Sequence, residues 1–323
     1  MRGAGRTVFE GNVSISGGIG LRDSRVVRSL QTASYGQNTI LDMQDTARFE
    51  NAGTLDALSD RDIRQFGSGS PRFTNTGTFL KRGAGTLRCS VAFRNSGTME
   101  LQAGTFEQAF RPYTQDAGVT RLNGGQLASG LPLDLQGGVL TGTGTITASV
   151  SNNGGVVRPG LNAGLLSIVG NYTQGPGTGL QIEIGGPVAG TQFDVLSVSA
   201  TATLAGDLNV VLLDGYQPQC GGVFDVLTAG LRVGVFGSVS LPTLPGIRLD
   251  IVYLADRVRL EVTCLADSDG DGDVDLDDFA MFAACVGEPD AVPPPGCESH
   301  DLDGDGDVDV EDFSILQNTF NAQ

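Results

Sequence analysis

The sequence has no tryptophan, one lysine (Lys81) and one histidine (His300) among its 323 residues. It also lacks any apolar run of the roughly 18 residues that a membrane-spanning helix needs, so we expect no transmembrane segment. The formal charge is −17, from 20 basic and 37 acidic residues. Nucleic-acid binding needs clustered cations that neutralise phosphates, and this composition therefore argues against a nucleic-acid partner.

Signatures of common enzymes are missing as well. The chain has no Gly-x-Ser-x-Gly elbow and no phosphate-binding Gly-Lys-Ser/Thr loop. Sugar cleavage usually needs two carboxylates that face each other, but the acids of the first 264 residues share no evident spacing. Surface charge explains a loose group of arginines: Arg61, Arg64, Arg72, Arg82 and Arg88. We predict no catalytic residues, and an enzyme acting on the O-glycosidic bonds of polysaccharides remains the alternative.

The acidic residues are concentrated near the C-terminus. Residues 265–323 contain 17 of the 37 acidic residues and no Lys or Arg, which leaves 20 acids and 20 bases in residues 1–264. All of the excess negative charge therefore lies beyond Cys264. Such a sharp change of composition predicts a domain boundary near this residue.

A repeat of about twenty residues runs through the first part of the chain. Aligned segments begin at Phe73, Phe93, Tyr113 and Leu133, with an earlier copy at Phe49. Each contains short alternating stretches between Gly-rich corners, a pattern that predicts strands rather than helices. One such unit cannot bury its apolar face alone, but stacked copies can. The repeat predicts a mostly β protein with a right-handed β-helix (β-solenoid), and a β-sandwich with Gly-rich turns is the alternative.

Stacking in register makes specific contacts. We expect an aromatic column inside the solenoid, formed by Phe49, Phe73, Phe93 and Tyr113. We also expect a polar ladder at one corner, formed by Asn51, Asn75 and Asn95. The solenoid is predicted to span residues 1–186, although residues 1–45 fit the repeat poorly. Longer alternating runs then predict a β cap over residues 187–264, which would cover the open strand edges.

These Phe-x-Asn-x-Gly-Thr units resemble the passenger repeats of autotransporter-like, adhesin-type β-helix proteins. The resemblance covers roughly residues 47–260. It implies a secreted or surface-displayed protein with a structural role.

Two twelve-residue loops follow, at 267–278 and 301–312, and they match position for position. Carboxylates occupy positions 1, 3, 5, 9 and 12, and a glycine at position 6 permits the sharp turn of a calcium loop. At position 7 the backbone carbonyl is the expected ligand. The predicted metal-binding residues are Asp267, Asp269, Asp271, Asp273, Asp275, Asp278, Asp301, Asp303, Asp305, Asp307, Asp309 and Asp312. We expect two Ca²⁺ ions, and we expect their binding to be coupled to folding because it offsets the repulsion of the carboxylates.

Each loop ends in Asp rather than Glu and precedes one amphipathic stretch, whereas no helix precedes the first loop. This arrangement resembles the dockerin type I module, a small α-helical domain, over residues 265–320, within a predicted domain 265–323. The resemblance implies docking to a cohesin-like or other surface protein, and a polysaccharide is a second candidate partner. Positions 10 and 11, often Ser/Thr in that family, are Leu276-Asp277 and Val310-Glu311 here.

The five cysteines bear on the compartment. Cys285 and Cys297 could close a small ring, Cys220 and Cys264 are a second candidate pair, and Cys89 is expected to be a buried thiol. We expect His300 to be exposed and without a role. Calcium and disulfides both favour an extracellular or cell-surface location, with a signal sequence lost through a truncated or misassigned start.

Overall fold

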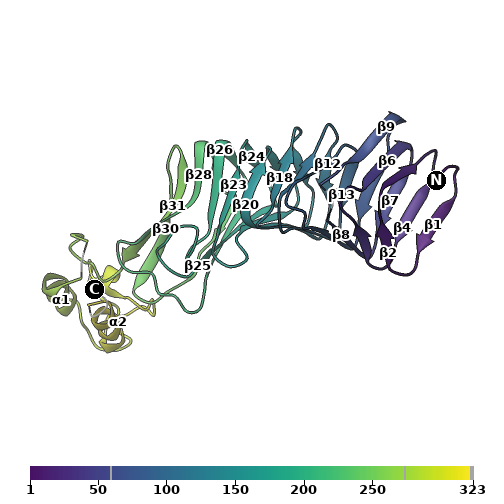
Figure 1. The fold of residues 1–323 in the computed structure, drawn as a ribbon. Coiled ribbons are helices and arrows are strands. Elements are labelled where there is room, and N and C mark those ends of the chain that lie inside the picture. Colours follow the sequence, from purple (N-terminus) through teal and green to yellow (C-terminus); the bar gives the residue numbers. More distant parts are fainter. Residues whose placement is uncertain (59, 273, 321–323) are drawn as a thin grey trace.

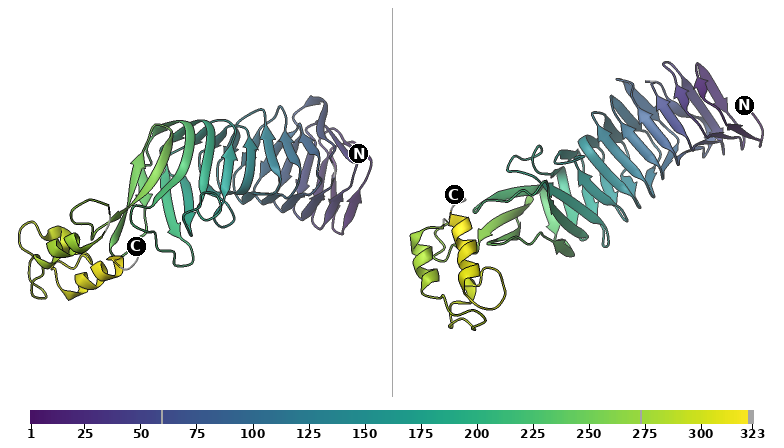
Figure 2. Two further views of the ribbon diagram at one scale, coloured as in Figure 1. Left: turned by 60° about the vertical axis from the view of Figure 1, so that its left-hand side comes forward. Right: turned by 90° about the horizontal axis from the view of Figure 1, so that it is seen from below.

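The computed structural model describes residues 1–58, 60–272 and 274–320. The chain forms a rod of stacked β-strands that ends in a small helical module (Figure 1). The N-terminus lies at the far end of the rod, and the helices lie beside its last strands in both views of Figure 2. No helix among the described residues is long and apolar enough to cross a membrane.

The rod is a β-solenoid in which each coil contributes one strand to each of three columns. The first column contains β1 (Arg6–Phe9), β4 (Val26–Ser29), β7 (Arg48–Asn51), β10 (Arg72–Asn75), β13 (Ala92–Asn95), β16 (Tyr113–Gln115), β19 (Leu133–Leu135), β21 (Val150–Asn152) and β24 (Tyr172–Gln174). The second contains β2 (Val13–Ile15), β5 (Ala33–Tyr35), β8 (Thr54–Ala57), β11 (Thr78–Lys81), β14 (Thr98–Leu101), β17 (Val119–Asn123), β22 (Val156–Pro159), β25 (Gly179–Ile184), β27 (Asp207–Leu212) and β29 (Ser238–Ser240).

The third column contains β3 (Gly18–Leu21), β6 (Ile40–Asp45), β9 (Ile63–Gly69), β12 (Thr86–Cys89), β15 (Thr105–Gln108), β18 (Gln126–Ser129) and β23 (Leu165–Ile168). Three long strands turn a corner and serve two columns: β20 (Val139–Thr147), β26 (Val195–Leu204) and β28 (Val223–Gly234). Strands of successive coils pair in parallel, as in β7, β10 and β13. The predicted β-solenoid is therefore confirmed.

The interior of the solenoid is built from side chains stacked in register. The rings of Phe49, Phe73 and Phe93 stack with centroids 5.0 Å apart, and Tyr113 continues the column at 5.5 Å. Phe79 from the second column meets Phe73 edge-on at 5.9 Å. The aromatic column that the repeat predicted is thus present, and it is buried throughout.

The asparagine ladder is also present, at the end of the first-column strands. The Asn51 amide donates to Asn75 Oδ1 at 2.7 Å, and the Asn75 amide donates to Asn95 Oδ1 at 2.8 Å. Each amide also donates to a backbone carbonyl of the next corner, that of Thr78 at 2.8 Å and that of Thr98 at 2.9 Å. These bonds join the side chains of one coil to the backbone of the next coil.

Residues 1–45 already belong to the solenoid, although their sequence fits the repeat poorly. In the first column, Val27 pairs with Phe49 and Ser29 pairs with Asn51. The same inward positions are therefore occupied, but by a smaller apolar residue and a smaller polar one. The strand pairing of these coils matches that of the later coils, but the Phe and Asn of the repeat are absent from them.

The parallel ladder continues beyond residue 187 through β26, β28 and β29. It ends where β31 (Arg257–Cys264) pairs antiparallel with β28 and with β30 (Ile247–Tyr253). This hairpin covers the edge of β28 from Val223 to Thr228. We propose that residues 187–264 act as the cap through this hairpin.

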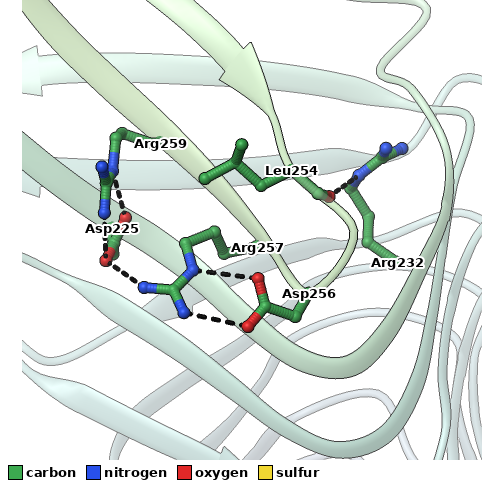
Figure 3. Close-up of polar contacts among 6 residues, drawn as sticks. All are labelled: Asp225, Arg232, Leu254, Asp256, Arg257 and Arg259. Atoms are coloured by element: carbon green, nitrogen blue, oxygen red, sulfur yellow. Dashed lines mark hydrogen bonds and ion pairs between the residues drawn. The ribbon is translucent and has the colours of Figure 1, made fainter.

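A cluster of ion pairs links the hairpin to the solenoid (Figure 3). Asp225 on β28 accepts from Arg257 Nη1 at 2.8 Å and from Arg259 Nε at 2.8 Å. Arg257 also donates to Asp256 at 2.9 and 3.0 Å, and Arg232 Nε donates to the Leu254 carbonyl at 2.7 Å. The cluster joins strands that meet in antiparallel pairing, so it stabilises the closure of the rod.

The helical module contains α1 (Leu276–Ala283), a short 3-10 turn (Glu298–His300) and α2 (Val310–Phe320). Disulfides join Cys285 to Cys297 within it and Cys220 to Cys264 at its junction with the cap. Cys89 is a buried free thiol, as expected. His300 is the exception: it is only 6% exposed, and its ring lies 6.2 Å from that of Phe282. The prediction of an exposed His300 was wrong, because the 3-10 turn directs the ring into the core of the module.

Candidate calcium-binding and docking site

Each acidic loop is joined to its helix by the same set of hydrogen bonds. The side chain of Asp275 caps α1 by accepting from Asp277 N at 2.8 Å, and Asp278 Oδ2 accepts from Asp275 N at 2.7 Å. In the second loop Asp309 accepts from Glu311 N and Asp312 accepts from Asp309 N, both at 2.8 Å. Each helix therefore starts with a capping box whose residues are also predicted calcium ligands.

The first residue of each loop fixes the turn that follows it. Asp267 accepts from Gly270 N at 2.8 Å and from Gly272 N at 3.2 Å, and Asp301 repeats both bonds with Gly304 and Gly306 at 2.8 and 3.0 Å. Gly272 and Gly306 at position 6 have φ of +104° and +105°. A side chain at either position would be strained, so glycine is needed there.

The predicted ligands gather to different degrees in the two loops. Carboxylate oxygens within 4.8 Å of one another come from Asp267, Asp269 and Asp271 in the first loop. In the second they come from three overlapping groups: Asp301, Asp303 and Asp312; Asp303, Asp305 and Glu311; and Asp307, Asp309 and Asp312. Among the described residues, Asp275 and Asp278 stay outside such a group. Asp273, also predicted, lies outside the described residues.

This donor set fits calcium by distance and by type. The ion binds carboxylate oxygens at about 2.3–2.6 Å, so two oxygens on opposite sides of it lie up to about 5 Å apart. Every predicted side chain is a hard oxygen donor. Glu311 was not predicted as a ligand, and its carboxylate joins one group of the second loop.

The negatively charged carboxylates of the second loop repel one another. Partial desolvation raises the pKa of Asp303 above its ordinary value, and the neighbouring carboxylates of Asp312, Asp305 and Asp301 add to the rise. The hydrogen bond from Asp305 N opposes it. A cation in the loop would reverse this effect, because it favours the charged form of every carboxylate around it.

An apolar groove lies between the two helices. It has a volume of about 580 Å³ and is lined by Phe279, Phe282, Ala283, Val286, Gly287, Pro289, Asp309, Val310 and Phe313. Leu276 and Val310, at position 10 of the loops, are 70% and 69% exposed. The sequence indicated that these two positions are apolar, but the groove itself depends on how α1 and α2 pack.

Several carboxylates of the solenoid form ion pairs with arginines. Asp42 pairs with Arg64, Asp56 with Arg82 at 3.2 Å, and Asp116 with Arg94 at 2.6 Å, each pair linking neighbouring coils. On the cap, the hydrogen bond from Arg259 is the main cause of the lowered pKa of Asp225. A general acid needs a raised pKa instead.

Two buried groups in the solenoid have raised pKa values without being catalytic candidates. Burial raises the pKa of Asp194 to about 8, although its two oxygens accept from Gly164 N at 2.8 Å and Glu183 N at 2.9 Å. Burial also raises the pKa of the Cys89 thiol to about 12. Both side chains are fully buried, so no substrate can reach them.

Residues 265–321 match the dockerin type I domain family. The C-terminal module is therefore a dockerin type I domain, as its loops and exit helices indicated. Dockerin domains of this type bind calcium and dock to cohesin modules, and they occur in extracellular and cell-surface proteins. No curated protein matches the chain. The resemblance of the solenoid to autotransporter passengers stays a prediction.

Proposed function

We propose that this protein is an extracellular structural rod whose dockerin domain anchors it to a cohesin-type partner protein in a calcium-dependent manner. The observation that carries the proposal is the repeated geometry of the two loops. Asp267 and Asp301 accept hydrogen bonds from the N–H groups of equivalent glycines. The solenoid would then display a surface at a distance from the anchor. Adhesion or surface display is the role that we assign to it.

Two Ca²⁺ ions belong to this proposal, one in each loop. Asp267, Asp269 and Asp271 would hold the first ion, and Asp301, Asp303 and Asp312 the second. The remaining predicted carboxylates complete the spheres: Asp275, Asp278, Asp305 and Asp309 by side chain, Asp273 and Asp307 by backbone carbonyl. Calcium then neutralises part of the acidic module and holds the starts of α1 and α2 in place.

We assign docking to the groove that Val310 and Phe313 line, and the exposed Leu276 is a further contact in this proposal. Residues 265–323 contain no Lys or Arg, so the partner's face should offer an apolar centre with a basic rim. The apolar residues at position 10 favour a partner different from one that recognises Ser or Thr there.

The test is binding of the full-length protein to a panel of cohesin modules by isothermal titration, with calcium and with EDTA. We expect binding in calcium, loss of binding in EDTA, and loss in the double variant Asp267→Ala/Asp301→Ala. Asp134→Asn on the solenoid is the matched control and should bind as the unaltered protein does. Binding that persists in EDTA would refute the calcium-dependent anchor.

A further inference from the structure

Two exposed phenylalanines mark one edge of the rod, where the third column turns into the first. Phe110 is 76% exposed and Phe66 is 51% exposed, whereas the phenylalanines of the aromatic column are buried. Isolated exposed apolar residues are ordinary. These two differ because each lies where the backbone is irregular: Phe110 at a longer corner and Phe66 in a bulge.

Phe110 lies in a corner that is one residue longer than its neighbours. Register pairs Cys89 with Gln108 and Phe93 with Tyr113, so the corner from Gln108 to Tyr113 contains one residue more than that from Cys89 to Phe93. The following corner, from Ser129 to Leu133, has the shorter length again.

The extra residue forces Phe110 into an unfavourable conformation. Arg111 N donates to the Ala109 carbonyl at 2.9 Å, which closes a three-residue turn with Phe110 at its centre. The φ of Phe110 is +62°, a conformation that is costly for a bulky side chain and easy for glycine. Backbone strain at a residue that exposes an aromatic ring is typical of a binding site rather than of core packing.

Phe66 is presented by a bulge. Met43 pairs with Gln65 and Asp45 pairs with Gly69, so three residues that begin with Phe66 lie opposite Gln44 alone. The ring therefore projects from β9 and does not follow the regular inward and outward alternation.

Hydrogen bonds tie the two departures together. Arg111 donates to Gln65 Oε1 at 2.9 and 3.2 Å, and Gln65 Nε2 donates to the Gly69 carbonyl at 3.0 Å. The buried amide of Gln108 holds the corner by donating to the Arg111 carbonyl at 3.1 Å. Phe66 and Phe110 thus lie on a fixed frame, two coils or about 10 Å apart along the rod.

The groups around the rings indicate the chemistry of a ligand. Arg88 lies 5.1 Å from the Phe110 ring centre and pairs with Glu107 at 3.4 Å, and Arg111 is engaged by Gln65. Glu107 thus compensates the charge of Arg88, and the neutral amide of Gln65 orients Arg111 without changing its charge. Two exposed aromatic rings on one edge of the rod, with polar groups between them, suit the apolar C–H faces of sugar rings.

We propose that this edge, defined by Phe66, Arg88 and Phe110, binds a linear polysaccharide by stacking of sugar rings. The site is separate from the dockerin domain and does not depend on the anchoring role proposed above. It gives the rod a second partner along its side.

The experiment is native affinity electrophoresis of the full-length protein in calcium, in gels that contain xyloglucan, xylan, mixed-linkage β-glucan or hydroxyethyl cellulose. We expect at least one polysaccharide to retard the protein. Phe110→Gly and Phe66→Ala should each weaken retardation at least tenfold, and Phe110→Tyr should retain it. Val211→Ala, at an exposed position on β27 of the second column, is the control and should leave retardation unchanged.

A stability measurement separates binding from packing. Glycine adopts the φ of residue 110 without strain, so Phe110→Gly should unfold at a temperature at least as high as that of the unaltered protein. A clearly lower unfolding temperature would mean that Phe110 serves packing and would overturn the proposal. Absence of retardation in all four gels would also overturn it. So would loss of self-association in Phe110→Gly with glycan binding unchanged, which would make the edge an interface between copies.

Discussion

Asp278 and Asp312 occupy equivalent places in the two halves of the dockerin domain, and both are completely buried. Asp278 Oδ1 accepts from Ser268 N at 2.6 Å, and Asp312 Oδ1 accepts from Leu302 N at 2.6 Å. One carboxylate therefore joins the start of each loop to the helix that follows it. The last position of the loop has a structural role as well as a predicted role in calcium binding.

Replacement of Asp312 by Ala should lower the affinity for calcium at least tenfold and reduce the helical content. The change removes a predicted ligand and leaves the N–H groups of Leu302, Asp303 and Asp309 without their acceptor. Isothermal titration and circular dichroism of the full-length protein measure the two effects.

The matched control is Asp277→Asn, which removes an exposed carboxylate that belongs to none of the acidic groups described. It should bind calcium nearly as the unaltered protein does. If Asp312→Ala keeps the full affinity, then position 12 is not a ligand of the second ion.

The aromatic column and the two dockerin loops could be predicted because each rests on a spacing that the chain repeats. Phe49, Phe73 and Phe93 stack because successive coils place them in the same register. The dockerin loops are local in sequence, so the order of their residues nearly determines their geometry. Both features need only short-range or periodic information.

The features that were missed depend on contacts between distant residues. His300 is buried because the 3-10 turn brings it against Phe282. The first coils were obscured because Val27 and Ser29 replace the Phe and Asn of the repeat. Asp225 meets Arg257 and Arg259 only after the terminal hairpin folds back onto β28. No periodic pattern signals such contacts.

Replacement of Asn75 by Ala should destabilise the solenoid by about 3 kcal/mol. The change removes the side-chain donor to Asn95 Oδ1 and one acceptor of the Asn51 amide, both in buried bonds, and it removes a partly buried bond to the Thr98 carbonyl. Chemical denaturation followed by circular dichroism measures the loss. Thr74→Ala, in the same strand but directed outward, should change stability by less than about 0.5 kcal/mol. Equal effects of the two substitutions would show that the ladder contributes nothing beyond packing.

Asp194 predicts a specific dependence of stability on pH. Its pKa is about 8 in the folded protein, above the ordinary value of 3.8, so the folded state holds a proton that the unfolded state releases. Its contribution to stability is complete below about pH 4 and is lost as the pH rises through 8.

The test compares Asp194→Asn with the unaltered protein by thermal unfolding from pH 5 to pH 9 in saturating calcium. The variant lacks the titrating group, so the unaltered protein should lose stability relative to it as the pH rises. The dockerin domain is the same in both proteins, so its contribution to the pH dependence of stability cancels from the difference. Parallel curves over this range would mean that the backbone donors Gly164 and Glu183 keep Asp194 ionised.

Replacement of Asp225 by Asn should destabilise the cap by about 1–2 kcal/mol, because one carboxylate accepts charge-assisted hydrogen bonds from both Arg257 and Arg259. The control, Asp250→Asn, removes an exposed ion pair with Arg248 beside an exposed hydrogen bond from Thr263, and it should cost less than about 0.5 kcal/mol. The arginines lower the pKa of Asp225, so its contribution is present above the ordinary pKa of an aspartate and is lost as the pH falls through the lower folded value. The difference between Asp225→Asn and the unaltered protein should therefore shrink in strong acid. Denaturation at pH 7 and pH 3 measures it, and a difference that stays constant would show that the ion pairs do not hold the hairpin to β28.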